Sequence, residues 1–276
     1  MRPPAALCLV LCAALLHAAA AFTRQDQLDK LIFFRDTMRE RSAHWRSATG
    51  NWECPTGSDG SCDPCGDGTI FGNWHHMFCR GLTPGKDGDG TIDGWVTNIH
   101  LSDLRIDGPV PRELCLFTEL RELDLDGGRL SGPLPEFLST CFPRLAEFDL
   151  SYNRLSGTVP TFFKNIENLQ EVELRRNRLL GTVPEEFGEM RALRELELDG
   201  NKLTGRIPQS FRKLNQTMTS ILVNDNDLEG DLSGLSSTPL MKVGIHNNPK
   251  LCGMVPASVR YAHGYNPVGT RLGQPC

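Results

Sequence analysis

The chain has 276 residues, of which 39% are hydrophobic and 23% are charged, and its mean hydropathy is −0.30. These values are typical of a folded globular protein and exclude a chain that is disordered throughout. The one long apolar run, from Ala5 to Ala21, is too little for a multi-span membrane protein. A net charge of −5 argues against general nucleic-acid binding, which depends on Lys and Arg neutralising phosphate. We therefore expect a neutral or positively charged partner.

The first 21 residues have the three parts of a secretory signal peptide. Arg2 precedes an apolar stretch from Ala5 to Leu16, and Ala18 to Ala21 supply the small residues that signal peptidase requires. We expect cleavage near Phe22; the alternative is an uncleaved signal anchor, although the stretch is short for a bilayer core. No second apolar stretch follows. The expected product is secreted, in the extracellular space or cell wall, with no membrane span after cleavage.

Eight cysteines remain once the signal peptide has removed Cys8 and Cys12. An even number in an exported chain predicts disulfides rather than thiols. These eight are Cys54, Cys62, Cys65, Cys79, Cys115, Cys141, Cys252 and Cys276.

The first four cysteines also allow a redox or metal site. Cys62-Asp-Pro-Cys65 has the spacing of redox motifs, and His75 and His76 would complete a set of zinc ligands. A thioredoxin-like site needs a βαβ context that this region lacks, and secreted cysteines usually pair. We expect two disulfides among the four, with a connectivity that the sequence does not reveal.

A repeat dominates the chain from Trp95 onward. Glycines recur every 23–25 residues, at Gly108, Gly132, Gly157, Gly181, Gly205, Gly230 and Gly253. In the same register lie four short segments in which apolar and polar residues alternate, which predicts strands with one buried face. These segments are Leu120 to Leu125, Leu145 to Leu150, Leu169 to Leu174 and Leu193 to Leu198. Each unit is therefore one coil of a solenoid.

An asparagine follows each strand by three residues, and a Gly-x-Val/Ile-Pro element follows in most units. We interpret the asparagines as structural, because a side-chain amide at this position can bond the free backbone groups of stacked turns. They are Asn153, Asn177, Asn201, Asn226 and Asn248. The glycine and proline then turn the chain toward the outer side of the coil.

With these features the sequence resembles the plant-type leucine-rich repeat proteins, whose unit reads L-x-x-L-x-L-x-x-N-x-L-x-G-x-I-P. The resemblance covers about seven coils and implies a right-handed, curved α/β-type solenoid with a parallel β-sheet on its concave face. It also implies short 3-10 or irregular convex segments and a helical, disulfide-capped N-terminus. Three positions depart from the unit: Leu104 and Gly128 replace asparagine, and the element at Gly230 lacks its proline. The expected division is 1–21 signal peptide, 22–94 cysteine-rich cap, 95–256 solenoid and 257–276 C-terminal tail.

Both caps add to the resemblance. Gln27 to Arg41 has apolar residues at helical spacing, and such a helix would cover the open end of the solenoid. Trp74 to Cys79 is similar to the W-x-G-V-x-C of the family's N-terminal cap. Asn247 to Gly253 is similar to the terminal N-x-P-x-L-C-G, which implies a Cys252–Cys276 disulfide. Separately, Cys115 and Cys141 lie 26 residues apart, close to one repeat, so we expect them to join adjacent coils on the convex side.

Two further motifs concern metal binding and modification. Asp87, Asp89 and Asp93 resemble the middle of an EF-hand loop, but the first ligand and the final glutamate are missing. The alternative to weak calcium binding is a solvated turn. Asn215 begins the one glycosylation sequon, Asn-Gln-Thr. No nucleophile elbow, phosphate loop, kinase signature or zinc-protease motif is visible, so we expect neither an enzyme nor a cofactor.

Function should lie on the concave face, where the outward residues of successive strands form columns about 4.8 Å apart. The first column is Asn98, Glu122, Glu147, Glu171, Glu195, Ser220 and Lys242; the second is His100, Asp124, Asp149, Glu173, Glu197, Leu222 and Gly244. The third is Ser102, Asp126, Ser151, Arg175, Asp199, Asn224 and His246. Four successive coils thus present two carboxylates each, and the proposed binding face comprises Glu122, Asp124, Glu147, Asp149, Tyr152, Glu171, Glu173, Arg175, Glu195 and Glu197.

Like charges at strand spacing oppose folding, so this array needs compensation. One reading is internal neutralisation by a basic column beyond the strands, formed by Arg129, Arg154, Arg178 and Lys202, with Arg121, Arg175 and Arg194 also near. The other is a surface that attracts a cationic protein or peptide. Resemblance to polygalacturonase-inhibiting proteins and to leucine-rich repeat receptor-kinase ectodomains implies a secreted enzyme or a receptor kinase as the partner.

We therefore expect a secreted protein that binds a basic protein or peptide on its acidic concave face, in recognition, signalling or enzyme inhibition. One alternative is a structural extracellular or cell-wall protein without a specific ligand. Another is a calcium-dependent binder that uses the Asp87–Asp93 loop and the acidic columns.

Overall fold

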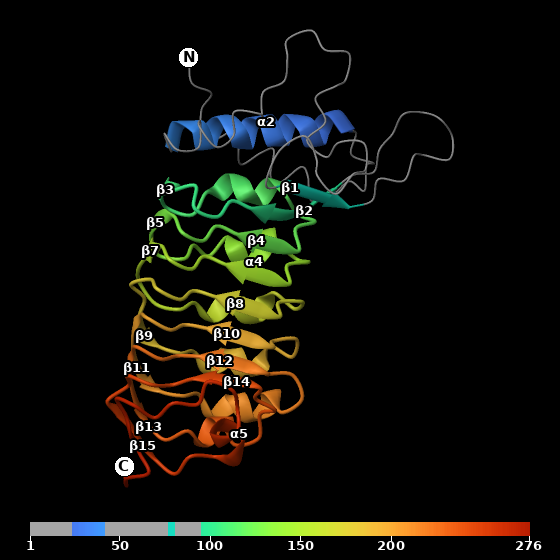
Figure 1. Cartoon of the computed structure of the whole chain (residues 1–276). Helices are drawn as coiled ribbons and strands as arrows, with labels where there is room; N and C mark the ends of the chain where they lie inside the picture. Colours follow the sequence, from blue (N-terminus) through green and yellow to red (C-terminus); the bar gives the residue numbers. More distant parts are fainter. Residues whose placement is uncertain (1–23, 42–76, 81–94) are drawn as a thin grey trace.

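Stacked coils form a curved solenoid in which one parallel sheet runs the length of the stack (Figure 1). The computed structural model describes residues 24–41, 77–80 and 95–276. The main sheet is 8-stranded, and β1 (Met77–Arg80) joins its edge antiparallel to β2 (Trp95–His100). The remaining members pair in parallel and in chain order: β4 (Glu122–Asp124), β6 (Glu147–Asp149), β8 (Glu171–Glu173), β10 (Glu195–Glu197), β12 (Ser220–Leu222) and β14 (Lys242–Gly244). This is the parallel concave sheet that the repeat predicts.

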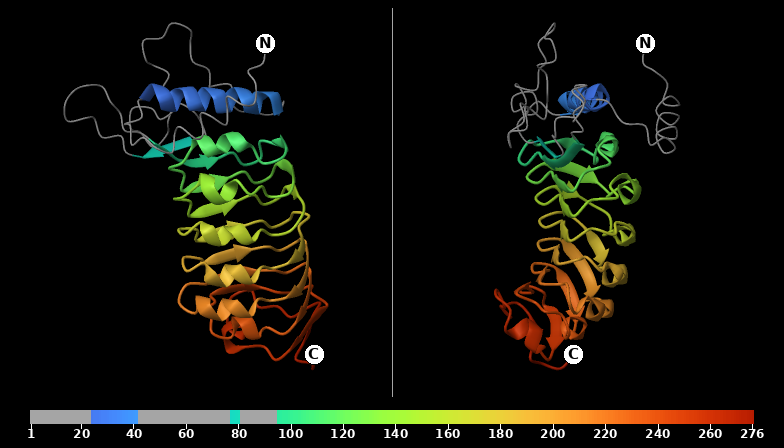
Figure 2. Two further views of the ribbon diagram at one scale, coloured as in Figure 1. Left: turned by 180° about the vertical axis from the view of Figure 1, so that it is seen from behind. Right: turned by 90° about the vertical axis from the view of Figure 1, so that its right-hand side faces the viewer.

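Short helical turns lie along the outer side of the bend (Figure 2). Most begin directly after the proline of a repeat, whose fixed φ suits the first position of a helical turn. They are η1 (Arg112–Leu116), α4 (Leu138–Cys141), η2 (Thr161–Asn165), η3 (Glu185–Glu189), η4 (Gln209–Leu214), η5 (Ser233–Leu235) and α5 (Ala257–Arg260). Because neighbouring strands lie only about 4.7–4.9 Å apart and a helical turn is wider, the coils are spaced further apart on the helical side and the stack curves.

Two smaller parallel sheets cover one flank of the solenoid, and the sequence reading did not include them. One contains β3 (Asp107–Gly108), β5 (Arg129–Gly132) and β7 (Arg154–Leu155). The other contains β9 (Leu180–Thr182), β11 (Lys202–Arg206), β13 (Asp227–Gly230), β15 (Lys250–Gly253) and β16 (Arg271–Leu272). They arise because the segment after each asparagine is extended and stacks on the same segment of the next coil.

The asparagine ladder is present as predicted. Asn177 Oδ1 accepts a hydrogen bond from the Leu155 N–H at 2.9 Å, while Asn177 Nδ2 donates to the carbonyl oxygens of Leu150 and Leu174 at 2.9 and 3.1 Å. Each asparagine thus ties its own coil to the preceding one. The departure at Gly128 has a physical reason, because a Cβ there would lie 2.6 Å from Asn153 Oδ1. Asn153 makes the ordinary ladder contact with the second coil, accepting a hydrogen bond from the Leu130 N–H at 2.9 Å.

A single apolar core fills the solenoid and is closed at its N-terminal end by α2 (Arg24–Arg41). The predicted cap helix is therefore present, and it begins three residues before the expected Gln27. Phe34 and Met38 are completely buried, and the Phe34 ring meets Phe117 edge-on with centroids 5.4 Å apart. Phe33, on the other side of the helix, is half exposed. This end cap removes from water the apolar surface that the first coil would otherwise expose.

Two disulfides hold the described part of the chain together. Cys115–Cys141 joins η1 to α4 on the convex side of adjacent coils, and Cys252–Cys276 ties the C-terminus to β15. Both pairs match the sequence-based expectation. Cys54, Cys62 and Cys65 lie outside the described residues, so the connectivity of the N-terminal cap stays a prediction. Among the helices that the structure describes, none is long and apolar enough to cross a bilayer.

Candidate protein-binding face

In-register pairing of the main sheet assembles the predicted acidic columns. Glu122 pairs with Glu147 and Glu147 with Glu171, and the series continues through Glu195. Asp124, Asp149, Glu173 and Glu197 pair in the same way one position on. The repeat length sets this register, because one whole unit separates each carboxylate from its neighbour. The alternate residues, such as Leu123 and Val172, point into the core and are buried.

Burial and mutual repulsion raise the pKa of most carboxyl groups in the middle of this face. The largest effect is at Glu173, whose pKa rises to about 8 because the group is partly buried and lies between Asp149 and Glu197. Burial also raises the pKa of Glu147, Asp149 and Glu171, and neighbouring carboxylates add to it. Folding therefore disfavours the ionised form of these carboxyl groups.

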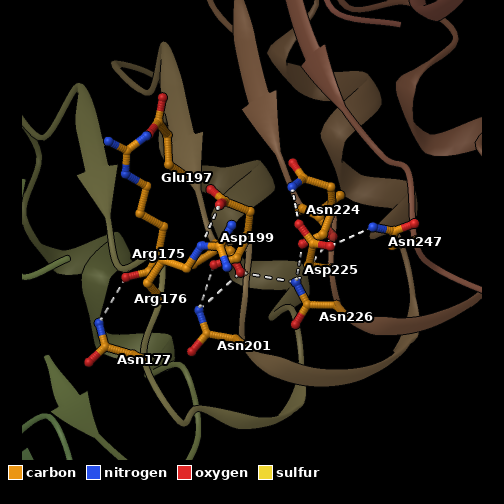
Figure 3. Close-up of polar contacts among 12 residues, drawn as sticks. Arg175, Arg176, Asn177, Glu197, Asp199, Asn201, Asn224, Asp225, Asn226 and Asn247 are labelled. Carbon is orange, nitrogen blue, oxygen red and sulfur yellow. Dashed lines mark hydrogen bonds and ion pairs between the residues drawn. The ribbon is translucent and has the colours of Figure 1, made fainter. Parts of the chain in front are cut away.

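Glu197 differs from the other acids because two cations contact it. Its carboxylate accepts hydrogen bonds from Arg175 Nη1 at 3.1 Å and from Lys242 Nζ at 2.8 Å, and its side chain is almost fully buried. Asp199, beside it, has Arg176 Nε at 4.0 Å (Figure 3). At the other end of the sheet, His100 Nε2 lies 3.0 Å from Glu122 Oε2. The cationic side chains that contact the acidic array therefore lie mainly at its two ends.

Internal neutralisation was expected from a basic column beyond the strands with Arg121, Arg175 and Arg194 nearby, and it is found at Arg175, which pairs with Glu197, and at Arg194, which lowers the pKa of Glu171. Arg129 lies 4.0 Å from Asp107, on the flank sheet. The flank strands turn the residues of this column away from the concave face, whereas Arg175 and Lys242 belong to the face itself. Lys242 reaches Glu197 across the whole of β12, a contact 45 residues apart in sequence.

Tyr152 is the large aromatic side chain exposed at the edge of the acidic array. Its side chain is 48% exposed, and the Arg175 guanidinium lies over its ring at 5.2 Å from the centroid. Both Tyr152 and its counterpart in the next coil, Arg176, have φ of +54°, a left-handed conformation that side chains other than Gly, Asn and Asp rarely adopt. The equivalent residues of the other coils are also left-handed, namely Asp103, Gly127, Gly200, Asp225 and Asn247. The conformation is therefore a turn of the repeat, and it fixes the direction in which the Tyr152 side chain leaves the backbone.

Further along the solenoid, toward the C-terminus, lies a polar cluster around Asp225 (Figure 3). Asp225 accepts hydrogen bonds from Asn224 Nδ2 and Asn247 Nδ2, both at 2.7 Å. Asn247 and Asn224 lower the pKa of Asp225 by stabilising its charged form. This carboxylate is satisfied within the protein, unlike those of Glu171 and Glu173.

One group of carboxylates was not recognised as a unit from the sequence. Asp124, Asp126 and Asp149 each offer an oxygen, and these oxygens lie within 4.8 Å of one another. Asp126 belongs to the third column but was not included in the predicted face. Its position beside Asp124 in the chain and Asp149 in space could have been found by reading the third column together with the second.

The remaining predicted residues are distributed away from this face. Asn215 is exposed and follows η4 on the convex side. Asp87, Asp89 and Asp93 lie outside the described residues, as do His75 and His76.

Comparison with known proteins identifies the family. Leucine-rich repeat family models match residues 119–141 and 143–203. The crystal structure of pollen receptor kinase 3 has 32% sequence identity with a TM-score of 0.53, over 65% of this chain and 81% of that chain. The chain belongs to the plant-type leucine-rich repeat proteins. No curated protein matches it.

Two other solved structures are similar to this chain. The PEPR1–AtPEP1 structure has 32% identity and a TM-score of 0.55 over 60% of this chain, which spans only 24% of the PEPR1 chain. A plant ice-binding protein has a TM-score of 0.68 over 91% of this chain and 73% of that one, with 20% identity. At that identity the likeness concerns the fold alone. The solenoid is thus shared by proteins with different ligands.

Proposed function

We propose that this leucine-rich repeat protein is a secreted, non-catalytic recognition protein that binds a basic protein or peptide on its concave face. The proposed footprint is centred on β4, β6 and β8, with Glu122, Glu147, Asp149, Glu171 and Glu173 as the charged contacts. Tyr152 and Arg175 border it. A receptor kinase or a secreted enzyme would be a partner consistent with the family.

The observation that carries this proposal is the uneven compensation of the acidic array. Glu197 is paired with two cations of the protein, whereas Glu171 and Glu173 lie among carboxylates that raise their pKa. A Lys or Arg side chain of a partner would neutralise these carboxylates in the way that Arg175 and Lys242 neutralise Glu197. Such complementarity speeds association and selects against acidic partners.

Tyr152 supplies the aromatic contact that such interfaces commonly need. Exposed tyrosines with a rigid backbone anchor many protein interfaces, because they bury a large area at a low entropic cost. The left-handed backbone and the stacked Arg175 hold this ring in place before a partner arrives. The face therefore offers one rigid anchor beside a charged field.

Export and modification complete the proposal. The N-terminal signal, the paired cysteines and the sequon at Asn215 all suit an extracellular protein. Because Asn215 lies on the convex side, a glycan there would leave the concave face free. Residues 257–276 would protect the last coil, with Cys252–Cys276 fixing the tail.

The test compares two variants with the same change in charge. The concave variant carries Glu147→Gln, Asp149→Asn, Glu171→Gln and Glu173→Gln; the control carries Glu113→Gln, Glu136→Gln, Glu167→Gln and Glu186→Gln, in or next to the helical turns. The secreted 22–276 protein and both variants are used to capture partners from the extracellular fluid of the source, at low and high salt. A partner that is basic, released by salt, retained by the control and lost by the concave variant supports the proposal.

Other results of this experiment would contradict the proposed function or favour an alternative one. A partner held equally by both variants, or held regardless of salt, would contradict recognition by the acidic face. Absence of any partner, with a concave variant that is simply more stable, would favour a structural extracellular protein.

A further inference from the structure

The basic column of Arg129, Arg154, Arg178 and Lys202 runs along the flank of the solenoid, where β5, β7, β9 and β11 follow one another (Figure 1). Each cation comes directly before a completely buried leucine of its coil, as Arg129 comes before Leu130. Successive residues of an extended segment point to opposite sides, so the four cations point outward, and all four are exposed. The column is therefore a feature of the flank surface.

Backbone hydrogen bonds between coils fix the spacing of the basic column. The Arg178 N–H donates to the Leu155 carbonyl oxygen at 2.8 Å, and the Lys202 N–H donates to the Leu179 carbonyl oxygen at 2.9 Å. Equivalent residues of adjacent coils are thus separated by about the strand spacing of 4.8 Å, and the four cations in single file extend over roughly 14 Å.

The segments that carry the basic column contain no acidic residue. These segments are 127–133, 152–158, 176–182 and 200–206. Arg176 and Arg206 lie in the same segments and add two cations to the four of the column. This flank is therefore opposite in sign to the chain as a whole, whose net charge is −5.

Most cations of the column have no anionic partner within the protein. Among the described residues, no carboxylate lies within ion-pair distance of Arg154, Arg178 or Lys202, and Arg129 has Asp107 at 4.0 Å. Like charges in neighbouring coils repel one another. An anion from outside the protein would relieve this repulsion.

Hydroxyl side chains lie beside the column on the same outward side. The residue two positions after each cation shares its side of the extended segment. In three of the four coils this residue has a hydroxyl group that is partly or fully exposed, namely Ser131, Ser156 and Thr204. The flank therefore presents cations and, next to them, groups that can form hydrogen bonds with an uncharged hydroxyl.

We propose that the basic column binds a linear anionic polysaccharide whose chain runs along the solenoid from coil to coil. Guanidinium groups form strong paired hydrogen bonds with planar or tetrahedral oxyanions such as carboxylate and sulfate. The hydroxyl groups beside the column would bond the sugar hydroxyls. A compact anion fits less well, because the four cations are spread in single file and do not converge on one point.

The site is distinct from the acidic concave face. The flank strands direct the basic column away from that face, so polysaccharide binding does not depend on the proposed protein partner. The expected export of the chain brings it to extracellular polysaccharides rather than to nucleic acids, which are the other common linear polyanions. Binding to any such polymer releases counterions and weakens as salt is added.

The test measures binding of the secreted 22–276 protein to four immobilised polymers by biolayer interferometry. They are alginate, which carries carboxylates, heparin, which carries sulfates, neutral dextran, and single-stranded DNA. We expect binding to alginate or heparin but not to dextran, with affinity falling at least about tenfold between about 50 and 200 mM salt. The preferred polymer shows whether the natural ligand is carboxylated or sulfated.

The flank variant carries Arg154→Gln, Arg178→Gln and Lys202→Gln. These side chains are exposed, so the melting temperature should not change, whereas the affinity for the polysaccharide should fall at least about tenfold at about 50 mM salt. Arg178→Gln alone, with an expected loss of at least about threefold, replaces this variant if it does not fold.

The matched control removes the same charge from exposed positions in or near the helical turns. It carries Arg191→Gln, Lys213→Gln and Arg260→Gln and should change the affinity less than about threefold. Equal losses in the flank variant and the control, or no binding to either anionic polysaccharide, would overturn the proposal. So would equal binding to dextran, or tighter binding to single-stranded DNA than to both polysaccharides. The concave variant should still bind the polysaccharide, which separates this site from the proposed protein-binding face.

Discussion

Substitution Glu173→Gln should stabilise the protein in neutral and alkaline solution. Glu173 lies in the middle of the second column, and burial, Asp149 and Glu197 raise its pKa from 4.5 to about 8. A folded-state pKa above the unfolded one means that the native protein holds the proton more tightly. The contribution of this group to stability is therefore fully favourable below about pH 4.5 and is lost as pH rises toward 8.

The magnitude follows from the same shift. At 1.36 kcal/mol per pH unit, the whole rise would correspond to roughly 5 kcal/mol. Glu173 retains part of its surface in water, so solvent screening reduces the expected cost of its charge to about 1–2 kcal/mol. Gln keeps the shape and a carbonyl oxygen but cannot ionise. The variant should be more stable than the parent by this amount at pH 8–9 and equally stable near pH 4.5.

Urea unfolding followed by circular dichroism from pH 4.5 to 9 measures the difference. The matched control is Glu197→Gln in the next strand of the same column, where the carboxylate is bonded to Arg175 and Lys242. Removing that charge leaves two cations with a weaker partner, so the control should be less stable than the parent by about 1–3 kcal/mol at pH 7. The inference that the acidic array is unevenly neutralised would be incorrect if both variants change stability in the same direction. It would also be incorrect if the effect of Glu173→Gln does not depend on pH.

Three further expectations test the ladder, the convex disulfide and the aromatic anchor. Asn177→Ala leaves one buried N–H and two buried carbonyls without their side-chain partner and should cost about 3 kcal/mol in chemical unfolding, whereas Asn168→Ala, an exposed asparagine, should cost under about 0.5 kcal/mol. Replacing Cys115 and Cys141 together by Ser should cost about 2–4 kcal/mol, and an unchanged melting temperature would show that the bridge constrains little. Tyr152→Ala should weaken the captured partner at least tenfold in a binding assay with no loss of melting temperature; intact affinity would exclude the ring as an anchor.

The repeat pattern predicted the solenoid because each local signal agrees with the same global arrangement. A spacing of 23–25 residues leaves one way to stack strands such as Leu145 to Leu150 on their neighbours with apolar residues inside. The same reasoning placed Glu147 beside Glu171 and the ladder at Asn177, and it paired Cys115 with Cys141. Contacts of this kind join equivalent positions one repeat apart, so their partners can be read from the period.

Contacts that break the period could not be read in this way. Lys242 reaches Glu197 two coils away because a long side chain spans β12, and nothing in the unit encodes that reach. Arg129 was expected to neutralise the acidic face from just beyond its strands, but the flank strand β5 carries it toward Asp107 instead. The flank sheets themselves arise from the extended segments after each asparagine, which carry no alternating pattern.

The amino-acid sequence by itself determined the number of coils, the inward and outward faces and the acidic character of the concave side. Its spacing alone also implied which residues meet across adjacent coils. Only the tertiary structure decided which acids are neutralised, that Tyr152 projects from a left-handed backbone, and that Asp124, Asp126 and Asp149 lie close together. The physical reason is that backbone register follows from a repeat, whereas the protonation and pairing of a side chain depend on burial and on the reach of its neighbours.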